Sequence, residues 1–154
     1  MKKLLTLLVL TLITATGCKS QATSADAKKL AQSSVKYEYR AYTRGTVINI
    51  AISDWGIGAS KGSPNDLLPE TFKAIGEKDK NVLLEETAKV NLAGLETLEA
   101  PSKKHQFDGA LAANLKITVD GKEYQTVTFD HGNPPTEIKA LVEKIIALSG
   151  LEKE

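Results

Sequence analysis

The sequence predicts an α+β fold in which two hairpins form a four-stranded antiparallel sheet with helices packed on one face. Two segments, 35–43 and 111–119, alternate apolar and polar residues, which is the pattern of a strand buried on one side only. Between residues 136 and 149, apolar side chains recur every three or four positions and so line one face of a helix. The predicted order of elements is ββααββα.

The first hairpin joins segment 35–43 to segment 46–53. Arg44-Gly45 supplies the turn, because glycine accepts a positive φ without strain. Residues 46–53 are rich in β-branched side chains, which favour strands. The next residues, 54–66, contain three glycines and a proline, and we expect them to form a loop.

Two helices are expected after this loop. The spacing of Leu68, Phe72 and Ile75 predicts a short helix that ends at Gly76. A second helix is expected to begin near Asp79. Its predicted inner side consists of residues that recur about one turn apart: Val82, Leu83, Thr87 and Val90. Over residues 91–101 the leucine spacing fits either an extended or a loosely helical conformation.

The second hairpin turns at Asp120-Gly121, a pair that favours two-residue turns because both positions tolerate a positive φ. Its return strand is expected over residues 122–129, and the residues 130–135 should break it. The final helix then runs from about Thr136 to Ser149, and Gly150 ends it.

The N-terminal residues have the layout of a secretory signal. Lys2 and Lys3 precede an apolar run over residues 4–13, and small residues follow it. The run is shorter than the roughly 20 apolar residues that span a bilayer. We therefore expect a signal that directs export, with the lysines on the cytoplasmic side.

The segment Ala15-Thr16-Gly17-Cys18 resembles the lipobox of bacterial lipoproteins, in which small residues precede a required cysteine. Ala15 departs from the leucine that is usual at the first position. The resemblance covers only the targeting segment and implies removal of residues 1–17 and acylation of Cys18. The expected partner of Cys18 is therefore membrane lipid, since two or more acyl chains hold a protein stably.

The residues after Cys18 bear on the destination. Lys19 stands where a retained inner-membrane lipoprotein of the enteric type has aspartate, so the resemblance implies the outer membrane. No acidic run follows, which favours an orientation toward the periplasm. Residues 18–33 are mostly small, polar or charged and are expected to form a flexible tether with a local helix over 25–32. Residues 34–154 are expected to form one globular domain.

Composition narrows the classes of partner. The chain carries 20 Lys and Arg and 19 Asp and Glu, and loss of Lys2 and Lys3 would change the net charge from +1 to about −1. A nucleic-acid partner would favour a basic domain, so none is expected. Cys18 is the only cysteine, which leaves the mature domain without an internal disulfide.

Two pairs of residues are candidates for chemistry. His105 and Asp108 precede the second hairpin, and Asp130 and His131 follow it. The two ends of an antiparallel pair are neighbours, so these residues could form a metal or acid–base site. The plainer interpretation is that the aspartates cap turns and the histidines are ordinary loop residues. No metal-ligand spacing such as His-x-x-x-His occurs, and no cofactor or metal is expected.

Trp55, in the glycine-rich segment, is a candidate binding residue or a cover over the edge of the core. Tyr42 is expected on the polar face of the first strand, near the same surface. No sequence motif indicates a catalytic nucleophile. The sequence thus predicts a membrane-tethered, non-catalytic module that binds a protein or another envelope component. The alternatives are a periplasmic enzyme inhibitor and a hydrolase or metal-dependent enzyme.

Overall fold

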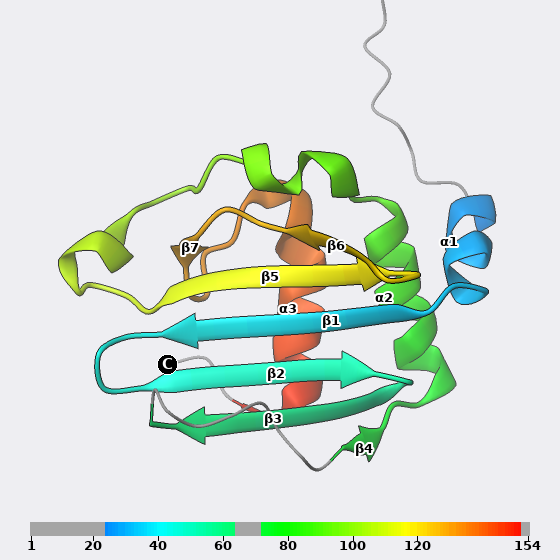
Figure 1. Cartoon of the computed structure of the whole chain (residues 1–154), viewed down its shortest axis with the longest axis horizontal. Helices are drawn as coiled ribbons and strands as arrows, with labels where there is room; N and C mark the ends of the chain where they lie inside the picture. The colour runs from blue at the N-terminus through cyan, green and yellow to red at the C-terminus, as the bar shows by residue number, and fades with distance from the viewer. Residues whose placement is uncertain (1–23, 64–71, 152–154) are drawn as a thin grey trace, which may run out of the picture.

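The computed structural model describes residues 24–63 and 72–151, which form an antiparallel sheet backed by helices (Figure 1). Within these residues the sheet has seven strands in the order β4-β3-β2-β1-β5-β6, and β7 pairs with β5. The α+β class is confirmed, whereas the expected four strands and ββααββα order are wrong.

The α-helices are α1 (Ser24–Ala31), α2 (Glu77–Ala88) and α3 (Lys139–Ser149). The 3₁₀ helices are η1 (Leu92–Thr97), η2 (Lys104–Phe107) and η3 (Thr136–Ile138). The strands are β1 (Val35–Tyr42), β2 (Val47–Ser53), β3 (Gly56–Gly62), β4 (Lys73–Ala74), β5 (Ala112–Val119), β6 (Lys122–Gln125) and β7 (Phe129–Asp130).

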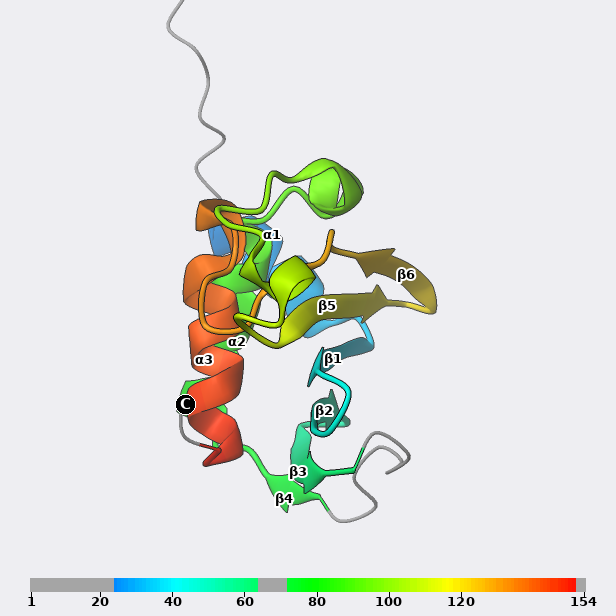
Figure 2. The ribbon, with the colours of Figure 1, turned by 90° about the vertical axis from the view of Figure 1, so that its left-hand side faces the viewer.

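The core lies between the sheet and the helices α2 and α3, which cover one face of it (Figure 2). In the central strand β1, Tyr37 and Tyr39 are fully buried, and their neighbours in sequence turn to the other face. Tyr39 lies between Ile50 of β2 and Leu115 of β5 in the register of the sheet. The alternation in the sequence therefore reports correctly which side chains form the core.

The outer face of the sheet carries charged side chains on the central and neighbouring strands. Lys116 of β5 forms ion pairs with Glu38 of β1, at 3.1 Å, and with Glu123 of β6, at 3.3 Å. Such cross-strand pairs suit a face that is open to solvent, where each contributes little to stability.

The expected glycine-rich loop is wrong where the structure describes it, because residues 56–62 form strand β3. Asp54 and Trp55 make the two-residue turn before it, with φ of 48° and 59°. Glycine is depleted in strands, which is why the sequence favours a loop here. In the structure, a Cβ added to Gly56 would lie 3.0 Å from Cβ of Phe72, so the missing side chain allows close approach of the neighbouring segment. Residues 64–66 lie outside the described residues.

The predicted helix over Leu68, Phe72 and Ile75 is also wrong in its described part. Leu68 lies outside the described residues, while Lys73 and Ala74 form β4 and pair with β3. Gly76 is the residue before α2 and does not end a helix. Gly can mark either end of a helix, and here it marks a beginning.

Helix α2 begins slightly earlier than expected, at Glu77, and buries Leu83 and Thr87 as predicted. Its third buried residue is Leu84, while Val82 is half-buried. The open question over residues 91–101 is answered by η1, which occupies Leu92–Thr97 and buries Leu95.

The second hairpin turns at Asp120 and Gly121, with φ of 50° and 83°, as predicted. Its return strand is interrupted after β6. Thr126 exchanges two hydrogen bonds of 3.0 Å with the backbone of Leu115, one of them through its hydroxyl, and the chain rejoins β5 as β7. The last predicted helix is confirmed as η3 followed by α3, and Gly150 ends it with φ of 71°.

Part of the expected tether is helical. The helix α1 lies within residues 18–33, contacts α2, and places Leu30 against the core. Residues 18–23, including Cys18, lie outside the described residues, as does the signal segment. None of the described helices is both long and apolar enough to cross a bilayer.

Candidate functional site

Four of the predicted candidates, His105, Asp108, Asp130 and His131, lie at the end of the sheet where β5 begins. Asp130, the last residue of β7, pairs with Ala112 of β5. The backbone N–H of His131 donates to the carbonyl of Leu111 at 2.9 Å, and that of Asn133 donates to the carbonyl of Asp130 at 2.8 Å. These bonds form a tight turn that fixes the Asp130 side chain toward the segment before β5.

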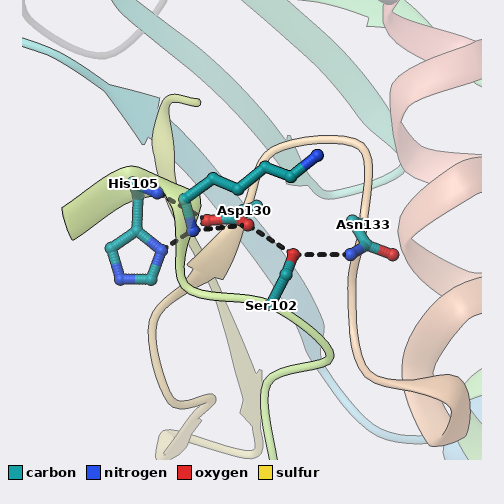
Figure 3. Close-up of polar contacts among 5 residues, drawn as sticks. Ser102, His105, Asp130 and Asn133 are labelled. Carbon is teal, nitrogen blue, oxygen red and sulfur yellow. Dashed lines mark hydrogen bonds and ion pairs between the residues drawn. The ribbon is translucent and has the colours of Figure 1, made fainter. Parts of the chain in front are cut away.

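The carboxylate of Asp130 accepts four hydrogen bonds from this segment (Figure 3). The Ser102 hydroxyl donates to Oδ2 at 2.5 Å, and the backbone N–H of Lys104 donates to the same atom at 2.9 Å. His105 donates to Oδ1 twice, from its backbone N–H at 2.8 Å and from Nδ1 at 2.6 Å. A carboxylate offers about four acceptor positions, so those of Asp130 are filled.

The charge on Asp130 is stabilised by these donors. The residue is only 2% exposed, and burial by itself would raise its pKa. The hydrogen bonds from Ser102, His105 and Lys104 outweigh burial and hold the pKa of Asp130 well below its ordinary value. The side chain is therefore an ionised carboxylate at neutral pH. Because an ionised carboxylate can only accept, Nδ1 of His105 carries the hydrogen between them.

The same network positions Ser102 and engages its hydroxyl hydrogen in a hydrogen bond to Asp130. Its Oγ donates to Asp130 and accepts from Nδ2 of Asn133 at 2.8 Å. In a Ser–His–Asp triad the serine donates to the histidine, and the histidine donates to the carboxylate. Here the serine and the histidine both donate to the carboxylate, so the arrangement differs from that of a nucleophilic hydrolase.

His131 belongs to a different set of contacts. Its Nδ1 lies 2.6 Å from the hydroxyl of Tyr39, and the two rings are 5.8 Å apart. Burial raises the pKa of Tyr39 far above its ordinary value, which keeps this phenol protonated. His131 thus joins the turn after β7 to the core beneath β1.

Of the four candidate residues, the structure therefore brings His105 and Asp130 into contact. Asp108 is exposed at the end of η2, where it adopts the left-handed conformation with φ of 56°. In the part of the chain that the structure describes, no three His, Cys, Asp or Glu side chains are arranged to hold a metal ion.

Trp55 lies at the opposite end of the sheet, in the turn between β2 and β3. Its indole packs against the core, and Nζ of Lys80 lies 4.9 Å from the ring centroid. Tyr42 is exposed on the outer face at the end of β1, with the Arg40 guanidinium 5.8 Å from its ring. The two residues that were expected near one surface are therefore separated by the length of the sheet (Figure 1).

Three residues of this region were not singled out from the sequence: Ser102, Asn133 and Phe107. Ser102 and Asn133 carry no local signal, because their role depends on the fold bringing them to Asp130. Phe107 does have a local sequence signal, because it is an aromatic residue in an otherwise polar stretch. It is 83% exposed, and no residue of η2 is buried.

The network lines an open depression of about 470 Å³ between η2 and the turn after β7. Its walls include the backbone and side chains of Ser102, Lys104, Leu111, Asp130 and Asn133. No family model, curated protein or solved structure matches the chain.

Proposed function

We propose that this chain is an envelope lipoprotein, anchored through an acylated Cys18, whose domain is a non-catalytic binding module that contacts its partner through η2. The observation that carries this proposal is the fixed position of an exposed segment. The residues of η2 add nothing to the core, yet a buried carboxylate accepts three hydrogen bonds from the first two residues of this helix and a fourth from Ser102 before it.

The physical cost of this arrangement supports a role in binding. Burying an ionised group is unfavourable unless hydrogen bonds compensate the loss of hydration. Fixing a surface segment through the buried carboxylate of Asp130 therefore requires the complete set of donors that surrounds it. A rigid contact segment loses less conformational entropy on binding than a mobile one. The network therefore supports a preorganised contact surface whose most exposed side chain is Phe107.

The same geometry favours binding over catalysis. The acceptor positions of Asp130 are occupied, so the carboxylate would have to release a donor before it could take a proton or a metal ion. The Ser102 hydroxyl hydrogen is committed to Asp130 as well.

A capture experiment tests the proposal. Purified, lipidated full-length chain is immobilised and exposed to an envelope extract, and Phe107→Ala is compared with Phe72→Ala. Phe72 is 43% exposed, which makes it a matched aromatic control away from η2. We expect a partner that is retained by the wild type and by Phe72→Ala but lost with Phe107→Ala. Retention that is indifferent to Phe107, or the absence of a reproducible partner, would contradict the proposal.

Inhibition of an envelope enzyme is one form that this binding could take. A rigid segment ending in an exposed aromatic residue suits insertion into the cleft of a lysozyme or protease. Activity assays of these enzymes with the wild type and with Phe107→Ala separate inhibition from simple binding.

Hydrolysis is the second candidate, because the Asp130–His105 pair is an arrangement that general bases use. With the hydrogen on Nδ1, the Nε2 atom of neutral His105 holds the lone pair that could accept a proton from water. If the wild type hydrolyses a substrate and folded His105→Ala does so equally well, His105 is not the general base. Asp108→Asn, at an exposed position nearby, serves as the control and should leave the hydrolysis unchanged.

A further inference from the structure

The end of the sheet that carries η2 exposes three positively charged side chains and an aromatic residue. Lys103 and Lys104 begin the segment, and Arg44 lies in the β1–β2 turn at the same end (Figures 1 and 2). All three are exposed, and among the described residues none of them forms an ion pair. Asp108 is the acidic side chain that this segment exposes, so the surface retains net positive charge.

Phe107 is the last residue of η2, and this helix is held in place at both ends. Asp130 fixes the start of η2, while the backbone N–H groups of Asp108 and Gly109 both donate to the carbonyl of Lys104 and close its end. Backbone in the left-handed region is unfavourable for a residue other than glycine. Asp108 nevertheless adopts the left-handed conformation, directly after the exposed Phe107.

We propose that Phe107 inserts into an apolar pocket of a protein partner, and that aspartate or glutamate side chains around this pocket pair with Lys103, Lys104 and Arg44. This inference rests on the proposed function and specifies the chemistry of its partner. An aromatic anchor surrounded by a polar rim is a common arrangement of energetically important interface residues. Complementary charge at the rim mainly accelerates association and selects the partner.

A protein partner fits the position of this surface better than the anchoring membrane does. The helix α1 precedes β1, whereas η2 lies at the other end of that strand (Figure 1). Eight residues of β1 separate the two ends by about 25 Å at 3.4 Å per residue. Cys18 is six residues before Ser24, so α1 can lie at most about 22 Å from the anchor. The opposite placement of α1 and η2 therefore suits an orientation in which η2 faces away from the bilayer that anchors the domain.

Site-specific cross-linking in the producing cells tests the proposal with the full, lipidated chain. The substitution Phe107→p-benzoylphenylalanine places a photoreactive group at the anchor position, and mass spectrometry identifies the peptide that it labels. We expect a protein adduct whose labelled site lies beside acidic residues. The double change Lys103→Glu and Lys104→Glu should reduce this adduct at least about fivefold at low salt and less at high salt.

The chain offers a matched control in Lys28 and Lys29, an adjacent, exposed pair on α1. Lys28→Glu with Lys29→Glu changes the net charge by the same amount and should leave the adduct unchanged. Thermal unfolding of each variant checks that the fold is retained. Co-sedimentation of the unacylated mature chain, residues 18–154 with Cys18→Ser, with phosphatidylglycerol vesicles tests the rival occupant, an anionic lipid surface.

The outcomes separate this inference from the proposed function. A protein adduct at position 107 that Lys103→Glu with Lys104→Glu leaves unchanged overturns the acidic partner and leaves the binding role intact. Labelling of lipid, or vesicle binding that Phe107→Ala abolishes, overturns the protein partner. The absence of any adduct, together with unchanged capture by Phe107→Ala, overturns both.

Discussion

Nδ1 of His105 lies 2.6 Å from Oδ1 of Asp130, although the two residues are 25 positions apart. The same carboxylate accepts the backbone N–H groups of Lys104 and His105 at the start of η2. Helices are usually capped by a side chain of the residue directly before them. Lys103 makes no such bond here, so Asp130 caps η2 from a distant strand.

The first prediction concerns this cap. Asp130→Asn keeps the size of the side chain but replaces one acceptor by an NH₂ group that faces backbone or side-chain donors. We expect the free energy of unfolding to fall by about 2–3 kcal/mol, because hydrogen bonds to a charged acceptor are lost in a buried place. Urea unfolding measures the change. Asp108→Asn, at an exposed position, should stay within about 0.5 kcal/mol of the wild type. Equal effects of the two substitutions would show that the network does not stabilise the fold.

The second prediction follows from the low pKa of Asp130. Its pKa in the folded state is below the value of about 3.9 in the unfolded chain, so the carboxylate stabilises the fold above that pH. This contribution is lost as the pH falls below about 4 toward the folded-state pKa. The difference in unfolding free energy between the wild type and Asp130→Asn should therefore shrink from pH 5 downward. A difference that is constant over this range would argue against an ionised Asp130 in the fold.

The sequence alone predicts much of the frame and little of the site. Strands β1 and β5 alternate cleanly, and α3 has one continuous apolar face, so local periodicity suffices for them. Strand β3 was missed because Gly56 and Gly58 favour a loop locally, while pairing with β2 decides their conformation. The contact between His105 and Asp130 could be anticipated from the hairpin that joins them. Ser102 and Asn133 could not, because each acts through a hydrogen bond that only the folded chain creates.

The third prediction concerns a buried pair that joins the sheet to α2. The Tyr37 hydroxyl lies 2.7 Å from Oγ1 of Thr87, which donates to the carbonyl of Leu83 at 2.7 Å, so Tyr37 is the donor between them. Burial raises the pKa of Tyr37 to about 12, despite this bond. Thr87→Val should cost about 1–3 kcal/mol, because it leaves a buried phenol unpaired, and Tyr37→Phe about 1 kcal/mol.

A double-mutant cycle provides the check on this pair. In the variant with both substitutions, neither hydroxyl remains, so its destabilisation should be smaller than the sum of the single effects. If the two changes in the free energy of unfolding, measured by chemical denaturation, were strictly additive, the two hydroxyls would not interact.

The fourth prediction uses two glycines that differ in their surroundings. Gly56→Ala places a methyl group 3.0 Å from Cβ of Phe72, so β3 and the segment before β4 must separate, at a cost of about 1–3 kcal/mol. At Gly45 an added Cβ meets nothing within 4 Å, and Gly45→Ala should be close to neutral. Thermal unfolding should thus rank Gly56→Ala well below Gly45→Ala. The reverse order would mean that the β1–β2 turn tolerates an added methyl group less well than the contact between Gly56 and Phe72 does.

The last prediction concerns the proposed anchor. Cys18→Ser removes the thiol that the lipobox resemblance assigns to acylation, so we expect the chain to lose incorporation of radiolabelled palmitate and to leave the membrane fraction. Each buried methylene of an acyl chain contributes about 0.8 kcal/mol, so loss of all chains should release the protein almost completely. Asp130→Asn, which disturbs η2 and leaves Cys18 in place, should remain labelled and membrane-bound. A Cys18→Ser variant that still takes up palmitate and sediments with membranes would place the attachment elsewhere in the chain.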